Sequence, residues 1–144
     1  MISNQDLFGT MRESDLTERL DERDLLGVTH GPGVYSLEVD VPDSAAAVQE
    51  RWLAQHDHDA PDDAYERLAA ADQVAYVGAS NDIYARLCEH VGGDVRRAAF
   101  LTVFDTVGVI DVWPDADPFS SEFNRAVRLT RDGWAVWTDG KLLG

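Results

Sequence analysis

Residues 74–91, VAYVGASNDIYARLCEHV, join a strand pattern directly to a helix pattern. Residues 73–78 are rich in β-branched and aromatic side chains and predict a strand, and 81–91 predict a helix with Ser80 as its natural cap. Arg86 and His90 lie four residues apart, so both side chains project from one face of that helix, one turn apart. The apolar stripe that faces the core is predicted to be Ile83, Leu87 and Val91.

A second strand pattern lies upstream, over residues 34–41, where apolar and polar residues alternate. The remaining segments predict a helix at 14–26, two helices within 42–72, a helix at 96–104, a strand at 107–113, a helix at 119–130 and a short strand at 134–138. On the helix at 119–130 we expect Phe123, Ala126 and Val127 to face inward. No repeat or flexible linker interrupts the chain, so we expect one α+β domain over residues 1–144.

The composition predicts a globular protein that folds without disulfides. Hydrophobic residues make up 44% of the 144 residues, and the single cysteine, Cys88, cannot form an internal disulfide. No apolar run approaches the length of a bilayer span, and the N-terminus lacks the basic and apolar segments of a signal peptide. We therefore expect a cytoplasmic protein without a membrane partner.

The charge of the chain is strongly negative and spread along its length. Twenty-seven acidic residues oppose twelve basic ones, of which only Lys141 is a lysine, and the net charge is −15. This aspartate-rich, lysine-poor composition resembles that of cytosolic proteins adapted to very high salt, and an ordinary acidic protein is the alternative. No basic patch is visible that would indicate a nucleic-acid partner. In molar salt, however, the Debye length falls to about 3 Å, so only charges that touch a phosphate contribute to binding.

Five polar side chains on the predicted elements can be arranged for the attack of water on a phosphodiester. They are Tyr35, Tyr76, Arg86, His90 and Glu122. Arginine offers a planar fork for phosphate oxygens, a lone carboxylate can hold a Mg²⁺ that keeps most of its waters, and a phenol or imidazole can accept a proton. Each residue also has a structural alternative: the tyrosines can pack the core, the arginine can pair with an acid on its own helix, and the histidine can complement the helix dipole.

The same residues carry a resemblance to a known family. The sequence has GVY at 33–35, and YVGASNDIYAR at 76–86 fits the pattern Y-[IV]-G-x-[ST]-x-[ND]-[IL]-x-x-R position by position. From Gly33 to about Arg131 the chain resembles the GIY-YIG nuclease family, many members of which have a histidine where His90 stands. The resemblance implies a small three-stranded antiparallel sheet flanked by helices, with a core at about 31–131 and a helical insertion at about 42–72. It also implies that the chain is an endonuclease that cleaves DNA with one Mg²⁺ or Mn²⁺ ion.

The resemblance further assigns roles to single residues. Tyr35 or Tyr76 would help to activate water, Arg86 would hold the scissile phosphate, His90 would orient the water or the tyrosine, and Glu122 would bind the metal. Further candidates for contacts to the substrate are Gly78, Ser80, Arg96, Arg97, Arg128 and Arg131. Each of these last four arginines is also explained as a solvated surface residue.

Three features depart from the family pattern. Forty residues separate Tyr35 from Tyr76, no asparagine follows Glu122 by about a dozen residues, and Arg125 lies three residues after Glu122, where an ion pair would compete with a metal. An alternative is therefore a non-catalytic interaction module on the same fold. It would dock a protein partner through the insertion at 42–72, with Trp52 and Tyr65 on its surface.

Overall fold

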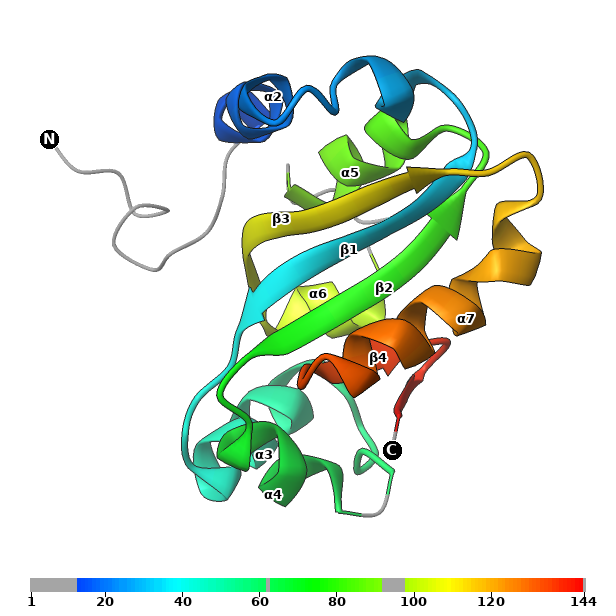
Figure 1. Cartoon of the computed structure of the whole chain (residues 1–144). Helices are drawn as coiled ribbons and strands as arrows, with labels where there is room; N and C mark the ends of the chain where they lie inside the picture. Colours follow the sequence, from blue (N-terminus) through cyan, green and yellow to red (C-terminus); the bar gives the residue numbers. More distant parts are fainter. Residues whose placement is uncertain (1–12, 62, 92–97, 144) are drawn as a thin grey trace, which may run out of the picture.

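A computed structural model of the chain describes residues 13–61, 63–91 and 98–143, and it confirms the α+β class. One sheet has helices on both of its faces (Figure 1). The helices are α2 (Glu13–Glu22), the 3-10 helix η1 (Gly27–His30), α3 (Ala45–Gln55), α4 (Ala64–Ala70), α5 (Ile83–Val91), α6 (Ala99–Val103) and α7 (Pro118–Arg131). The strands are β1 (Gly33–Asp40), β2 (Val74–Ser80), β3 (Asp105–Pro114), β4 (Ala135–Thr138) and β5 (Lys141–Leu142).

The sheet has the strand order β3-β1-β2-β4-β5 and mixes strand directions. β1 pairs antiparallel with β2 and with β3, whereas β4 pairs parallel with β2. The expected three-stranded antiparallel sheet is therefore wrong, because β3, β1 and β2 form only part of a five-stranded mixed sheet. The cause is the connection through α7, which carries the chain across one face of the sheet and returns β4 to the outer edge of β2 (Figure 1).

The pleat of the strands divides the apolar side chains between two cores, one on each face of the sheet. The larger core lies under α5 and α6 and includes Tyr35, Leu37, Ile83, Leu87, Phe100 and Trp137. The smaller core lies under α7 and includes Val34, Ala75, Val77, Ala126, Leu129 and Val136. Figure 1 shows this division, with α7 on one side of the sheet and α5 and α6 on the other. The fold therefore gives β1 and β2 two faces with different surroundings.

Helices α3 and α4 form the insertion between β1 and β2, and its large aromatic residues are part of the core. Trp52 is 5% exposed and Tyr65 is 8% exposed. The Trp52 ring packs against Trp137 of β4, with centroids 5.5 Å apart, and its indole N–H donates to the carbonyl of His58 at 3.0 Å. The expected docking surface made by Trp52 and Tyr65 is therefore wrong, because both side chains are buried.

Helix ends and faces differ from the sequence expectation in two places. The first helix ends at Glu22 instead of 26, and Asp24, two residues later, adopts a left-handed φ of 57°, a conformation that ends helices. On α7, Phe123 is 56% exposed, because the buried side of that helix is set by Pro118, Ala126 and Leu129. None of the helices in the described part of the chain is both long and apolar enough to span a membrane.

Candidate active site

The register between β1 and β2 brings the two tyrosines together on the α5 face of the sheet. Tyr35 lies opposite Gly78 and Leu37 lies opposite Tyr76, so the two phenol rings are diagonal neighbours, with centroids 6.4 Å apart. A side chain on Gly78 would collide with Tyr35, since a Cβ there would overlap the phenol oxygen and lie 2.6 Å from Cζ. Gly78, which we expected to contact substrate, therefore makes room for the first tyrosine.

A short turn after β2 sets the direction of α5. The Ser80 hydroxyl accepts a hydrogen bond from the backbone N–H of Asp82 at 3.0 Å and donates to the carbonyl of Asp82 at 2.9 Å. In turn, the Asp82 carboxylate accepts a hydrogen bond from the N–H of Ala85 at 3.2 Å. Ser80 thus holds the turn, and Asp82 satisfies an N–H of the first helical turn, the role that we expected of Ser80.

His90 lies at the end of α5, is 4% exposed, and is hydrogen-bonded through both ring nitrogens. The N–H of Ala98 donates to His90 Nδ1 at 3.3 Å, and His90 Nε2 lies 2.7 Å from Tyr35 Oη. Because Nδ1 accepts a hydrogen bond, the neutral imidazole carries its proton on Nε2 and donates it to Tyr35. The ring of Tyr76 lies beside both groups, with its centroid 6.4 Å from that of Tyr35 and 5.7 Å from that of His90. A chain of hydrogen bonds therefore runs from Ala98 through His90 to Tyr35, and Tyr76 packs against its end.

Arg86 lies one turn before His90 and interacts with the same phenols. Its guanidinium forms an ion pair with Glu89, 3.0 Å from Nη1 to Oε1, and a hydrogen bond with Tyr35. The side chain of Arg86 is 29% exposed, so solvent or a ligand reaches part of it. The ion pair with Glu89 is the structural role that the sequence allowed, and here it holds the guanidinium beside Tyr35.

Burial and neighbouring charges set the acidity of the two phenols. Desolvation raises the pKa of Tyr35 far above its usual range, Tyr76 raises it further, and Arg86 lowers it. Desolvation also raises the pKa of Tyr76, to about 12, while Arg86 lowers it and Glu122 raises it. Tyr35 is 1% exposed, whereas Tyr76 is only partly buried. Tyr76 is therefore the more acidic and the more accessible of the two phenols.

Glu122 approaches the tyrosines from α7, on the opposite face of the sheet. Its half-buried carboxylate accepts a hydrogen bond from the N–H of Ala79, in the part of β2 that extends beyond the pairing with β4. Desolvation raises the pKa of Glu122, and the charge of Asp139 raises it further. The charge of Glu122 itself raises the pKa of Tyr35 and of Tyr76. The carboxylate thus interacts electrostatically with the phenols at the end of β2 that has no β4 partner.

Arg125 does not neutralise Glu122 in the part of the chain that the structure describes, where no ion pair joins the two side chains. Its guanidinium lies over the ring of Trp113 instead, with Cζ 5.0 Å from the ring centroid. Because the guanidinium stacks on this indole, the competing ion pair that the spacing allowed is absent. The Glu122 carboxylate is therefore not paired with Arg125 and can interact with the phenols or with a cation.

Asp139 is a site residue that the sequence analysis missed. It lies in the turn between β4 and β5 with a left-handed φ of 50°, and its charge raises the pKa of both Glu122 and Tyr76. The dipeptide Asp139-Gly140 indicates only a turn in the sequence. Its position beside the site depends on the pairing of β4 with β2, which no local pattern predicts. Two expected contacts, Arg96 and Arg97, lie outside the described residues.

A divalent cation would find few protein ligands at this site. Among the described residues, no group of three or more His, Cys, Asp and Glu side chains could hold a metal ion. Glu122 and Asp139 fit a Mg²⁺, because the charge of Asp139 raises the pKa of Glu122 and a cation would offset that repulsion. Mg²⁺ commonly binds through one or two carboxylates and keeps several waters, so this donor set suits a hydrated ion.

Comparisons of the chain with protein-family models, with curated proteins and with solved structures give no match. The resemblance to the GIY-YIG family therefore stays a prediction that rests on the residues at 33–35 and 76–86. The geometry of Tyr35, Tyr76, Arg86, His90 and Glu122 is independent of that resemblance, because it follows from the strand register and the hydrogen bonds of the fold.

Proposed function

We propose that this protein is a divalent-metal-dependent endonuclease that hydrolyses phosphodiester bonds of DNA in the cytoplasm. The observation that carries the proposal is the buried hydrogen bond between His90 and Tyr35, with the Tyr76 ring packed beside both and with Arg86 and Glu122 acting on the phenols. Tyrosines that only pack a core need no buried imidazole hydrogen-bonded through both nitrogens. The motif at 76–86 supports the same activity.

Tyr76 is the residue to which we assign the role of general base. A phenolate on Tyr76 would be partly accessible to solvent and favoured by the charge of Arg86, whereas a phenolate on Tyr35 would be fully buried. In the proposed reaction, Tyr76 acts as a phenolate: its Oη takes a proton from water as the water oxygen attacks phosphorus, and the bond from phosphorus to the leaving oxygen breaks. The leaving oxygen then takes that proton, which restores the phenolate. His90 and Tyr35 keep Tyr76 oriented, so their role is positioning.

Arg86 is assigned to the scissile phosphate, and Glu122 to the metal. The guanidinium of Arg86 offers a fork that matches phosphate oxygens, and Glu89 and Tyr35 fix its position before substrate binds. Glu122, with Asp139 beside it, would hold a hydrated Mg²⁺ or Mn²⁺. Such an ion supplies Lewis-acid stabilisation of the phosphate and of the leaving oxygen.

Adaptation to high salt belongs to the same proposal. At low ionic strength, the net charge of −15 would repel DNA. In molar salt the Debye length is about 3 Å, so the repulsion between distant charges is screened and only side chains that touch the DNA affect binding. Trp52 and Tyr65 are buried, so these two side chains do not form the docking surface of the alternative, a non-catalytic interaction module.

The test is cleavage of supercoiled plasmid and of branched DNA with Mg²⁺ or Mn²⁺ at high KCl. Arg86→Ala should lower the cleavage rate by roughly 100-fold or more, as expected when a charged group that stabilises a transition state is removed. Glu122→Gln, which keeps the shape of the side chain, should lower the rate at all metal concentrations. Tyr76→Phe should lower it by about 100-fold or more, because the proton acceptor is lost.

Matched controls separate these losses from general damage to the fold. Glu66→Gln on the exposed side of α4 and Arg19→Ala on α2 remove the same charges far from the phenols, and both variants should cleave like the parent. Cleavage that persists in Arg86→Ala and in Glu122→Gln would show that the activity arises elsewhere. Absence of cleavage by the folded parent under all these conditions would overturn the proposal.

A further inference from the structure

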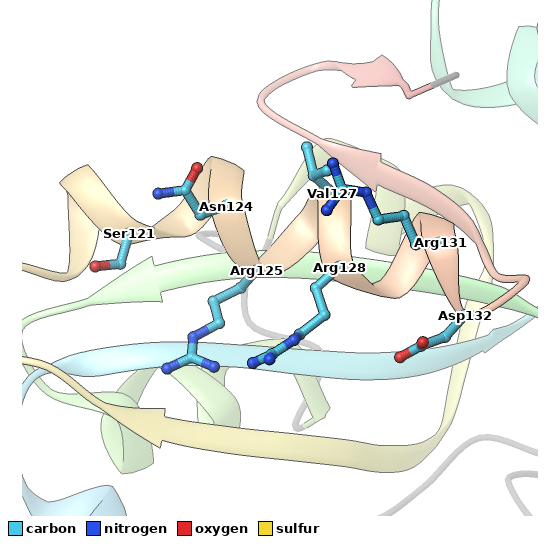
Figure 2. Close-up of a pocket in the computed structure, with 7 residues that line it drawn as sticks. All are labelled: Ser121, Asn124, Arg125, Val127, Arg128, Arg131 and Asp132. Carbon is cyan, nitrogen blue, oxygen red and sulfur yellow. The ribbon is translucent and has the colours of Figure 1, made fainter.

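The outer side of α7 carries a shallow hollow that the proposed reaction does not use. Its volume is about 620 Å³, and we call it the α7 hollow. It is lined by Ser121, Asn124, Arg125, Val127, Arg128, Arg131 and Asp132 (Figure 2). Figure 2 shows Arg125 and Arg128 extending from the helix in the same direction. The hollow begins at Ser121, next in sequence to Glu122, so it adjoins the candidate active site along the helix.

The charge of the α7 hollow is opposite to that of the whole protein. Three arginines and one aspartate line it, which gives a local charge of 3 − 1 = +2, whereas the chain carries −15. Glu122, the only acid within α7, hydrogen-bonds to Ala79 of β2 and does not line the hollow. A positive surface that persists among twenty-seven acids indicates an anionic ligand.

The arginines of the hollow also differ from three other described arginines in their partners. Arg51, Arg67 and Arg86 each form an ion pair, with Asp105, Asp63 and Glu89 respectively. Within the described ranges, no ion pair involves Arg125, Arg128 or Arg131. Arg125 also interacts electrostatically with Asp115, whose pKa it lowers, whereas Arg128 and Arg131 form no ion pair with any acid in the described ranges. Arg125 is in addition held against Trp113, which reduces the side-chain entropy that it would lose on binding.

The spacing of these groups fits the backbone of a nucleic acid. Residues 125 and 128 are separated by a rise of about 4.5 Å along the helix axis, and their side chains extend in the same direction, whereas Arg131 extends on the other side of the helix (Figure 2). One strand of a DNA duplex carries a phosphate every 3.4 Å of its axis, so Arg125 and Arg128 match the spacing of two neighbouring phosphates. Asn124 adds a neutral hydrogen-bond donor of the kind that contacts phosphates, whereas the Ser121 hydroxyl already donates to the carboxylate of Asp115.

We infer that the α7 hollow binds the phosphate backbone of the DNA substrate beside the bond that is cleaved. This inference rests on the proposed function, since it assigns the surface that holds the same substrate. Arg125 and Arg128 are the principal contacts. The proposed surface lies on the face of the sheet opposite to the buried phenols, and Glu122 is the residue of α7 that connects the two sides.

The test measures DNA binding as a function of salt, separately from cleavage. A fluorescein-labelled duplex is titrated with Glu122→Gln protein from 0.2 to 1 M KCl, and binding is followed by anisotropy. Adding Arg125→Gln and Arg128→Gln should reduce the slope of log Kobs against log[KCl] by about 1.8, since each phosphate contact contributes about 0.9. Over this range of salt, the affinity of the parent should then fall roughly 20-fold more than that of the double variant.

Two further variants complete the design. Arg19→Gln with Arg23→Gln removes two positive charges from the region of α2 and should leave the slope unchanged. Arg125→Lys with Arg128→Lys keeps both charges, so this variant should retain most of the slope of log Kobs against log[KCl]. An unchanged slope and affinity in the Arg125→Gln, Arg128→Gln protein would overturn the inference while leaving the nuclease proposal intact. A parent that neither binds nor cleaves DNA would overturn both.

Discussion

The two faces of the sheet differ in whether their polar side chains are buried and paired. On the α5 face, an imidazole and a phenol are almost fully buried and hydrogen-bonded to each other, His90 to Tyr35 at 2.7 Å. On the α7 face, Arg128 and Arg131 are exposed and lie outside the ion pairs of the described residues. The first arrangement fixes orientation and shifts pKa values, and the second leaves charge available to a ligand.

This difference predicts which measurements respond to substitution on each face. Buried hydrogen-bonded groups contribute to stability and to pH dependence, because their charged forms are desolvated. Exposed arginines contribute to salt-dependent binding and little to stability. Substitutions on the α5 face should therefore change the free energy of unfolding and the pH at which stability is lost in alkaline solution. Substitutions in the α7 hollow should change neither quantity by much.

The largest effect is expected from Trp52, which belongs to the core of the α5 face. Trp52→Ala should lower the free energy of unfolding by about 3–5 kcal/mol, because a large buried ring is lost and its contact with Trp137 with it. Leu53→Ala, at the next position but 43% exposed, should cost less than about 1 kcal/mol. Urea unfolding of both variants measures the difference. Equal, small losses would mean that the insertion is a separate appendage.

The next effect is a loss of stability in alkaline solution. Folding raises the pKa of Tyr76 to about 12 from an ordinary value near 10. The neutral phenol therefore contributes fully to the free energy of unfolding below pH 10, and this contribution is lost as the pH rises toward 12. A shift of two units corresponds to about 3 kcal/mol. Tyr76→Phe should therefore remove part of the decline seen by urea unfolding between pH 8 and 12. Superimposable curves for parent and variant would show that the phenol titrates normally.

A smaller effect is expected where the backbone of β2 meets the first tyrosine. Gly78→Ala should destabilise the fold by about 1–3 kcal/mol and displace Tyr35, because the new methyl group overlaps its phenol. Gly31→Ala is the control, since Gly31 has extended backbone angles and open space around it, and it should change stability by no more than about 0.5 kcal/mol. A Gly78→Ala protein as stable as the control would mean that the ring does not lie over β2.

The part of the site that the sequence predicts is the part encoded locally. Tyr76, Arg86 and His90 lie within 74–91, where strand, turn and helix follow one another directly and helical spacing alone puts the last two on one face. Tyr35 is placed beside them because an antiparallel register aligns alternate residues of two strands. These relations depend on periods of two and 3.6 residues, which can be counted in a sequence.

The remaining features depend on which element covers which face, and periodicity does not contain that information. Trp52 and Phe123 are both large and apolar, yet the fold buries one and exposes the other. The position of Asp139 follows from a parallel pairing between strands separated by β3 and α7. A turn signal gives the conformation of such a residue but not its neighbours.

The aromatic ring of Trp137 has a consequence for how the chain reaches its folded state. It stacks on Phe100, with centroids 4.7 Å apart, and packs on Trp52, so three rings from widely separated segments meet in one core. During synthesis this core cannot close until residue 137 has left the ribosome, and the earlier apolar surfaces remain uncovered until then. This domain should therefore fold only after residue 137 has been synthesised, in one cooperative step, and a nascent chain that stops at Gly133 should be open to proteases.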